Sequence, residues 1–171
     1  MKRLLLLRHA KSSWDNPDLA DIDRPLAPRG IEAALLIGRT ITQRNWLPDR
    51  ALVSTAERTR ETWRLVAGEW SSRPEPSFSQ VLYEAPAETV LDEIRRSGGD
   101  AETLLVIGHN PGLGDLAARL ADKASPAKLA KSLKKKFPTG ALAVFDFDGG
   151  WTDLGAGRAM LTHFLRPKDL G

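Results

Sequence analysis

The sequence predicts an α/β fold in which helices cover a mostly parallel central sheet. Apolar, strand-like runs alternate along the chain with runs whose apolar residues recur at helical spacing, and this alternation is typical of such folds. The 171 residues, of which 42% are hydrophobic and 27% charged, suffice for a substantial core. Because no internal repeat is visible, we expect a single domain over residues 1–171.

The first predicted strand covers residues 4–7, four leucines that lead directly into Arg8 and His9. Lys2 and Arg3 precede this run as in a secretion signal, but such a signal needs an apolar stretch of about 7–15 residues. We therefore assign the strand to the mature fold. A polar, proline-bearing loop follows, and then a predicted helix whose apolar face consists of Ile31, Ala34, Leu35, Gly38 and Ile41.

The second unit begins with a predicted strand over residues 51–54. Ser54 and Glu57 match an S-x-x-E capping box, so we expect Ser54 to cap the helix that follows. One face of this helix is predicted to carry Trp63, Val66, Ala67 and Trp70.

The third unit begins with a strand-like run over residues 77–82, and Glu84 follows it closely. The next predicted helix has Pro86 near its first position and Gly98 after its end, as is common for helix boundaries.

The fourth unit is the apolar strand predicted over residues 103–108, which leads into His109. Asn110 is the expected N-cap of the next helix and Pro111 its expected first residue. Two more strands, at 141–147 and 158–165, are predicted on either side of a Gly-rich turn.

Side chains capable of chemistry recur at one position in this pattern, shortly after a predicted strand: Arg8, His9, Arg58, Glu84 and His109. In a parallel sheet these strand ends share one edge. Open α/β sheets bind ligands at that edge, where helix N-termini add backbone donors suited to phosphate. The leucine strand is therefore expected to be a rigid support for His9.

Two arginines, two histidines and a carboxylate in one cleft suit phosphoryl transfer. Arg8 and Arg58 can bind phosphate oxygens in a bidentate manner, and positive charge near His9 lowers its pKa and favours the neutral, nucleophilic imidazole. His109 is expected to bind the same oxygens, and to add a charge if protonated. Such a cationic site needs no metal or organic cofactor, and Glu84 is the candidate acid for a poor leaving group.

The sequence resembles the histidine phosphatase superfamily at "LLLLRHAKSSWD", "VSTAERTRET" and "VIGHNPGL", and "DRPLAPRG" at 23–30 most resembles its SixA-type phosphohistidine phosphatases. The similarity extends over essentially the whole chain. It implies a three-layer α/β/α fold like that of phosphoglycerate mutases. It also implies a phosphohistidine intermediate on His9, with the phosphoryl group held by Arg8, Arg58 and His109.

The sequence departs from the related mutases, which typically have glycine and asparagine where Ala10 and Asp15 stand here. The SixA branch does not clearly need a general acid, so the role of Glu84 stays open.

Each assignment has a structural alternative. Arg58 can be read as a solvated helix arginine, and His109 as a strand-end histidine that donates to a carbonyl. His163, in the last strand, matches no motif and is expected to be structural. A zinc site from His9, His109 and Glu84 lacks any local ligand motif, so no metal is predicted.

A basic stretch over residues 123–136 carries six lysines against a single neighbouring acid, Asp122. It can be a solvated helix face, a patch that attracts an acidic phosphoprotein, or a nucleic-acid contact. Nucleic acid is not expected, because no recognition motif or aromatic interleaving accompanies the lysines, and the formal charge is only +3.

The chain has no cysteine and no apolar run of about 18 residues, so we expect a cytoplasmic protein that does not span a membrane. The sequence thus predicts a metal-independent phosphatase that acts on phosphohistidine in a protein. The alternatives are a phosphatase of small phosphate monoesters and a non-enzymatic phosphate-binding module. The oligomeric state is not predicted.

Overall fold

A computed structural model describes residues 1–170, and its centre is one six-stranded sheet. The strands are β1 (Lys2–Arg8), β2 (Arg50–Ser54), β3 (Pro76–Ser79), β4 (Thr103–Gly108), β5 (Leu142–Phe147) and β6 (Met160–Leu165). Their order is β3-β2-β4-β1-β5-β6. The pairs β1·β4, β2·β4 and β2·β3 are parallel, whereas β5 is antiparallel to both of its neighbours. The predicted mostly parallel sheet is confirmed.

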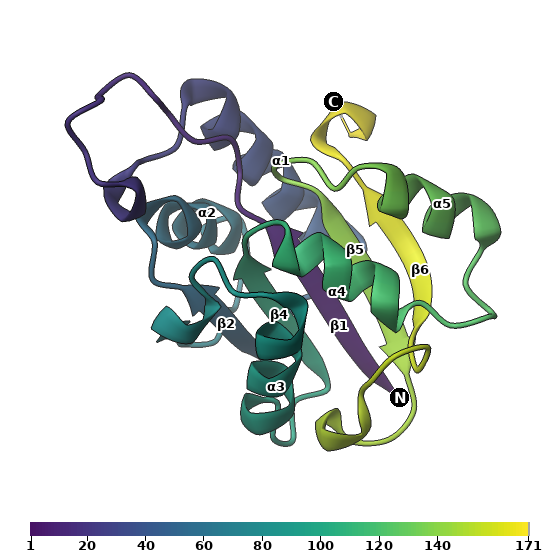
Figure 1. Cartoon of the computed structure of the whole chain (residues 1–171). Helices are drawn as coiled ribbons and strands as arrows, with labels where there is room; N and C mark the ends of the chain where they lie inside the picture. The colour runs from purple at the N-terminus through teal and green to yellow at the C-terminus, as the bar shows by residue number, and fades with distance from the viewer. Residues whose placement is uncertain (171) are drawn as a thin grey trace.

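Helices cover both faces of this sheet, as Figure 1 shows. They are α1 (Pro28–Gln43), α2 (Glu57–Ala67), α3 (Ala87–Ser97), α4 (Gly112–Leu120) and α5 (Ala127–Lys135). One core cluster joins the sheet to α1 and α2, and a second joins it to α3, α4 and α5. The arrangement is therefore the three-layer α/β/α fold that the resemblance implied.

The leucine strand β1 lies between β4 and β5 and supplies both cores. Leu4 and Leu6 belong to one core cluster, Leu5 and Leu7 to the other, and none of the four is more than 1% exposed. A strand covered on both faces needs an unbroken apolar run, which explains the sequence. Burial on both sides also fixes the end of the strand, where the chain continues into His9.

Two helix starts differ from the sequence-based predictions. Ser54 is the last residue of β2 and not a helix cap, because α2 has Ala56 as its N-cap and no side-chain cap bond. The helix α4 begins at Gly112, one residue after the predicted Pro111. Asn110 is not the N-cap residue, but its side chain still bonds to the start of the helix, because its Oδ1 accepts a hydrogen bond from the Gly114 amide at 3.0 Å.

Two other boundaries also differ. The strand predicted over residues 77–82 ends at Ser79, the last residue of β3. Its predicted second half forms a 3₁₀ turn instead, η2 (Gln80–Leu82). Trp70 lies beyond the end of α2, although its ring is buried and its indole N–H donates to the Gly38 carbonyl. Further 3₁₀ turns are η1 (Asp21–Asp23), η3 (Trp151–Asp153) and η4 (Pro167–Asp169).

The register of β1 and β4 places the two histidines of the predicted site next to each other. Arg8 of β1 is opposite Gly108 of β4, so His9 and His109 follow adjacent parallel strands side by side. The loop between β1 and α1 lies at the same end of the sheet, far from the N-terminus (Figure 1). Within residues 1–170, no helix combines the length and the apolar character that crossing a membrane requires.

Candidate active site

The five side chains selected from the sequence line one pocket of about 320 Å³ beyond the carboxyl ends of β1 and β4. They are Arg8, His9, Arg58, Glu84 and His109. The pocket is completed by Lys11, Ser12, Trp14, Asp21, Arg24, Asn110 and Thr139. The five side chains therefore lie in one cleft, as the sequence pattern predicted, although Glu84 does not directly follow a strand.

His9 is held in one orientation by hydrogen bonds at the end of β1. Its amide donates to the Gly108 carbonyl at 3.1 Å. Its ring Nδ1 lies 2.7 Å from the Ala10 carbonyl oxygen, which only accepts hydrogen bonds, so Nδ1 carries the proton. In the neutral ring this leaves the lone pair on Nε2.

His9 is neutral at physiological pH. Only 6% of the residue is exposed, and this burial lowers the pKa of His9 to about 3. The Ala10 hydrogen bond acts in the opposite direction, while charges on His109, Arg58 and Arg8 lower the pKa further. The neighbouring cations were expected to lower this pKa, but burial has the larger effect.

His109 lies next to His9, with their ring centroids 5.3 Å apart. Its Nε2 is 2.7 Å from the Ser54 hydroxyl oxygen, which also accepts the Ala56 amide at 3.4 Å. Because a hydroxyl can both donate and accept, this contact fits either neutral tautomer of the His109 ring. Within residues 1–170, the buried Nδ1 of this ring has no hydrogen-bond partner.

The pKa of His109 is lowered to about 4, first by burial and then by the charge on Arg58. His109 is therefore neutral near pH 7. The condition for an added charge, protonation of the ring, is therefore met only at acidic pH.

The two arginines are fixed by separate partners. Arg8 donates from one terminal nitrogen to the Phe137 carbonyl at 3.1 Å, and its buried Nε has no partner within residues 1–170. Arg58, in the first turn of α2, donates to the Asp21 carbonyl at 2.8 Å and to the Asp21 carboxylate at 3.0 Å. Because Arg58 is only 5% exposed, it is not a solvated helix arginine.

Asp21 is the centre of a cluster that sequence reasoning did not find. Besides Arg58, its carboxylate accepts hydrogen bonds from Arg24 at 2.9 Å and from the Tyr83 hydroxyl at 2.5 Å. The Tyr83 bond, followed by the two arginines, holds the pKa of Asp21 well below its usual range. Arg24 also stacks on Trp14, which is 75% exposed at the rim of the pocket. Asp21 lies just before the "DRPLAPRG" motif at 23–30, which contains its partner Arg24, and no sequence signal marked Asp21 itself.

Glu84 lies at the exposed rim of the same pocket. It follows η2 and not a strand, and its backbone is left-handed with φ 51°. No hydrogen bond or ion pair holds its carboxylate among residues 1–170. It is therefore the least constrained of the five predicted side chains.

Two further expectations concern groups outside this arrangement. His163 does not line the pocket and packs its ring against Trp46, with centroids 4.8 Å apart. In the part of the chain that the structure describes, no three His, Cys, Asp or Glu side chains form a group that could hold a metal ion.

The chain is similar to several known proteins. A family model for the histidine phosphatase superfamily (branch 1) matches residues 4–86, which include His9, Arg58 and Glu84. An uncharacterised protein of Mycobacterium tuberculosis is 40% identical over 164 residues, which cover 95% of this chain and 100% of that protein.

Two solved structures are also similar over nearly the full length. The candidate phosphohistidine phosphatase SixA of Nakamurella multipartitia matches with a TM-score of 0.85 at 29% identity, covering 97% of this chain and 96% of that one. The corresponding candidate from Agrobacterium tumefaciens matches with a TM-score of 0.80 at 31% identity, covering 97% and 98%.

Proposed function

The chain belongs to the histidine phosphatase superfamily, and from this premise we propose that it hydrolyses phosphohistidine in a protein through a phosphohistidine intermediate on His9. The observation that carries the proposal is the state of His9. A buried, neutral ring holds its proton on Nδ1 against the Ala10 carbonyl, so Nε2 is available to attack phosphorus.

The proposed reaction has two steps. First, the Nε2 lone pair of His9 forms a bond to phosphorus while the bond from phosphorus to the leaving nitrogen breaks. The leaving imidazole keeps that electron pair. Second, water attacks the phosphorus of phospho-His9, the bond to Nε2 breaks, and the water loses a proton to solvent. Inorganic phosphate and free His9 result.

The donors around the pocket suit the charge that the transferred phosphoryl group carries. The partnerless Nε–H of Arg8 is a buried donor, the buried Nδ1 of His109 can donate when it carries the ring proton, and Arg58 adds a second guanidinium charge. Positioning and electrostatic stabilisation are the main sources of catalysis in phosphoryl transfer. We therefore propose that these side chains suffice without a metal ion or cofactor.

Two observations favour phosphohistidine as the substrate. The similar solved structures carry the name of candidate phosphohistidine phosphatases, and one of them is 31% identical to this chain. An imidazole that departs from phosphorus is also a better leaving group than an alkoxide, so it needs little help from the loosely held Glu84.

A phosphatase of small phosphate monoesters is the second candidate. The carboxylate of Glu84 lines the same pocket as His9, which is where a general acid for an alkoxide leaving group would have to lie. A non-enzymatic phosphate-binding module would need the same donors but no free nucleophile.

A trapping experiment tests the proposed function. The protein is mixed with a phosphohistidine peptide carrying ³²P and quenched within milliseconds, and acid-labile label is located by peptide mapping. We expect a burst of released peptide and label on His9, and neither with His9→Ala, which should remain folded. Turnover by His9→Ala would contradict the covalent mechanism, and hydrolysis of small esters alone would favour the second candidate.

A further inference from the structure

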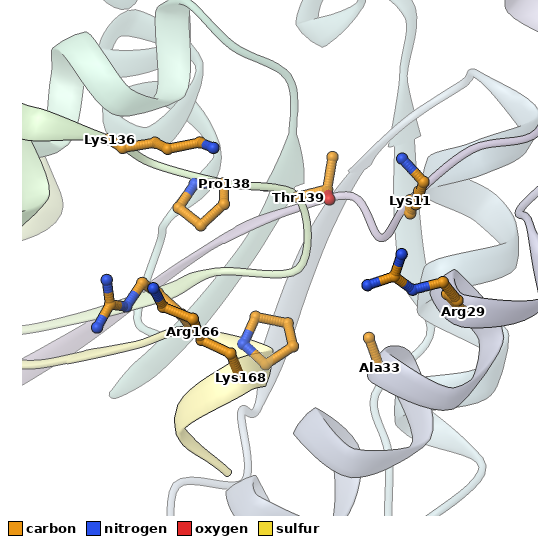
Figure 2. Close-up of a pocket in the computed structure, with 9 residues that line it drawn as sticks. Lys11, Arg29, Ala33, Lys136, Pro138, Thr139, Arg166 and Lys168 are labelled. Carbon is orange, nitrogen blue, oxygen red and sulfur yellow. The ribbon is translucent and has the colours of Figure 1, made fainter. Parts of the chain in front are cut away.

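A second pocket of about 330 Å³ adjoins the candidate active site and is lined by five basic side chains. They are Lys11, Arg29, Lys136, Arg166 and Lys168. In the described residues no Asp or Glu lines this space, which we call the basic pocket. Figure 2 shows Arg29 and Lys136 extending toward it from opposite sides.

Most of these charges lack a counter-charge in the protein. Arg166 pairs with Asp169 through an Nε–Oδ2 contact of 2.9 Å. The other four basic side chains make no ion pair with any residue in 1–170. Like charges that converge on a concave surface raise the local concentration of anions, so the basic pocket is suited to an anionic ligand.

The basic pocket is connected rigidly to His9. Lys11 and Thr139 line both pockets. The Gly140 amide donates to the carbonyls of Arg8 at 3.1 Å and His9 at 2.9 Å, which ties one wall to the end of β1. The other wall is tied by the Ala27 amide, which donates to the Lys11 carbonyl at 2.9 Å. A ligand that reaches both pockets would therefore meet them at a fixed separation.

Positive charge continues beyond the basic pocket along one side of the active site. Lys136 also lines a third pocket with Lys134, Lys135 and a single acid, Asp115, and that pocket shares Arg8 and Asn110 with the active site. Such an extent exceeds what a single additional phosphate group would occupy. It matches a chain segment that carries several negative side chains.

We infer that the basic pocket binds carboxylate side chains of an acidic segment in the phosphorylated protein whose phosphoryl group is transferred to His9. The inference rests on the proposed function and adds the chemistry of the substrate around the phosphohistidine. The inference assigns this binding role to only some of the lysines in residues 123–136. Of these lysines, only Lys134, Lys135 and Lys136 line pockets beside the active site.

The test compares two phosphohistidine peptides of equal length, one with Asp and Glu on both sides of the phosphohistidine and one with Asn and Gln. The variant Arg29→Gln/Lys168→Gln removes two charges from the basic pocket. The control Lys123→Gln/Lys128→Gln removes two charges from exposed lysines that do not line it. The measured quantity is the ratio of kcat/KM for the acidic peptide to kcat/KM for the neutral one.

The ratio should fall about 2- to 30-fold in Arg29→Gln/Lys168→Gln at low salt, mostly through KM, and should stay at the wild-type value in the control. The difference should shrink as salt screens the exposed charges. Equal ratios in all three proteins would overturn the inference, as would an equal decrease in both double variants.

A binding measurement separates this inference from the proposed function. Fluorescence anisotropy of the labelled, unphosphorylated acidic peptide requires no turnover. If neither peptide is hydrolysed while an aryl phosphate is, the proposed function fails, and weaker peptide binding by Arg29→Gln/Lys168→Gln alone still supports the basic pocket. Equally good competition by a single-stranded oligonucleotide of the same charge would overturn the assignment to an acidic protein segment.

Discussion

Acidification from pH 7 to pH 4.5 should destabilise the folded chain through His9 and His109, because both imidazoles are buried in the neutral form. Burial lowers the pKa of His9 from 6.5 to about 3, and that of His109 from 6.5 to about 4. The unfolded chain therefore binds protons that the folded chain does not. The contribution of the two neutral histidines to the free energy of unfolding is fully present above pH 6.5. It is lost as the pH falls from 6.5 toward the pKa values of the folded chain.

The size of this loss depends on how far the pH lies below the pKa of the unfolded imidazole. At pH 4.5 the unfolded imidazole is two units below its pKa of 6.5, while both folded imidazoles remain mostly neutral. Each unit corresponds to about 1.4 kcal/mol, so each histidine should reduce the free energy of unfolding by about 2–3 kcal/mol relative to pH 7.

The assay is urea unfolding at pH 7 and pH 4.5, followed by the fluorescence of the 5 tryptophans. For wild type, His9→Asn and His109→Asn, the free energy of unfolding at pH 4.5 is expressed relative to the value of the same protein at pH 7. A general loss of stability in a variant then cancels, and the titration of carboxylates cancels when the variants are compared with wild type. His163→Asn is the control, because His163 is partly exposed and should contribute less. If wild type and both pocket variants lose stability equally on acidification, the assigned neutral, buried state of the histidines is wrong.

Three further outcomes are expected. Activity should survive EDTA and be inhibited by vanadate, because we propose that Arg8, Arg58 and His109 stabilise the phosphoryl group without a metal; loss of activity with EDTA that a divalent ion restores would argue for a metal enzyme. Ser54→Ala should reduce kcat about 3- to 10-fold with the fold retained, because His109 loses the hydroxyl that fixes its ring, and an unchanged kcat would remove Ser54 from the site. Glu84→Gln should slow alkyl phosphates by about 10²–10⁴-fold but aryl phosphates and phosphohistidine little, whereas a uniform small loss would leave Glu84 no role as an acid.

The fold and the strand-end residues were predictable because their signals are local. An unbroken leucine run indicates a strand covered on both faces, and the residue after such a strand necessarily lies at the edge of the sheet. Arg58 was predictable for a similar reason, because it belongs to the first turn of the helix that follows β2. Boundaries were less predictable: Ser54 matches the capping pattern, yet β2 extends through it and its hydroxyl contacts His109.

The remainder of the site depends on contacts between distant segments. Asp21 meets Arg58 and Tyr83 only because the loop between β1 and α1 folds over the pocket. The basic pocket likewise combines Lys11 and Arg29 with residues near the C-terminus. No spacing within one segment predicts such a group, whereas the obvious lysine run of residues 123–136 contributes only its last members to the surface beside the active site.

The hydrogen bond between His9 and the Ala10 carbonyl has consequences for both steps of the proposed mechanism. In the first step it keeps the proton on Nδ1, so that Nε2 is the nucleophile. The same proton remains on Nδ1 after Nε2 has bonded to phosphorus, and the phosphorylated ring is then a cation whose charge the anionic phosphoryl group offsets. When water attacks, the ring departs as a neutral imidazole and does not need to gain a proton. Burial, which disfavours a charged ring, keeps His9 neutral before the attack and should promote its departure from phosphorus in the second step.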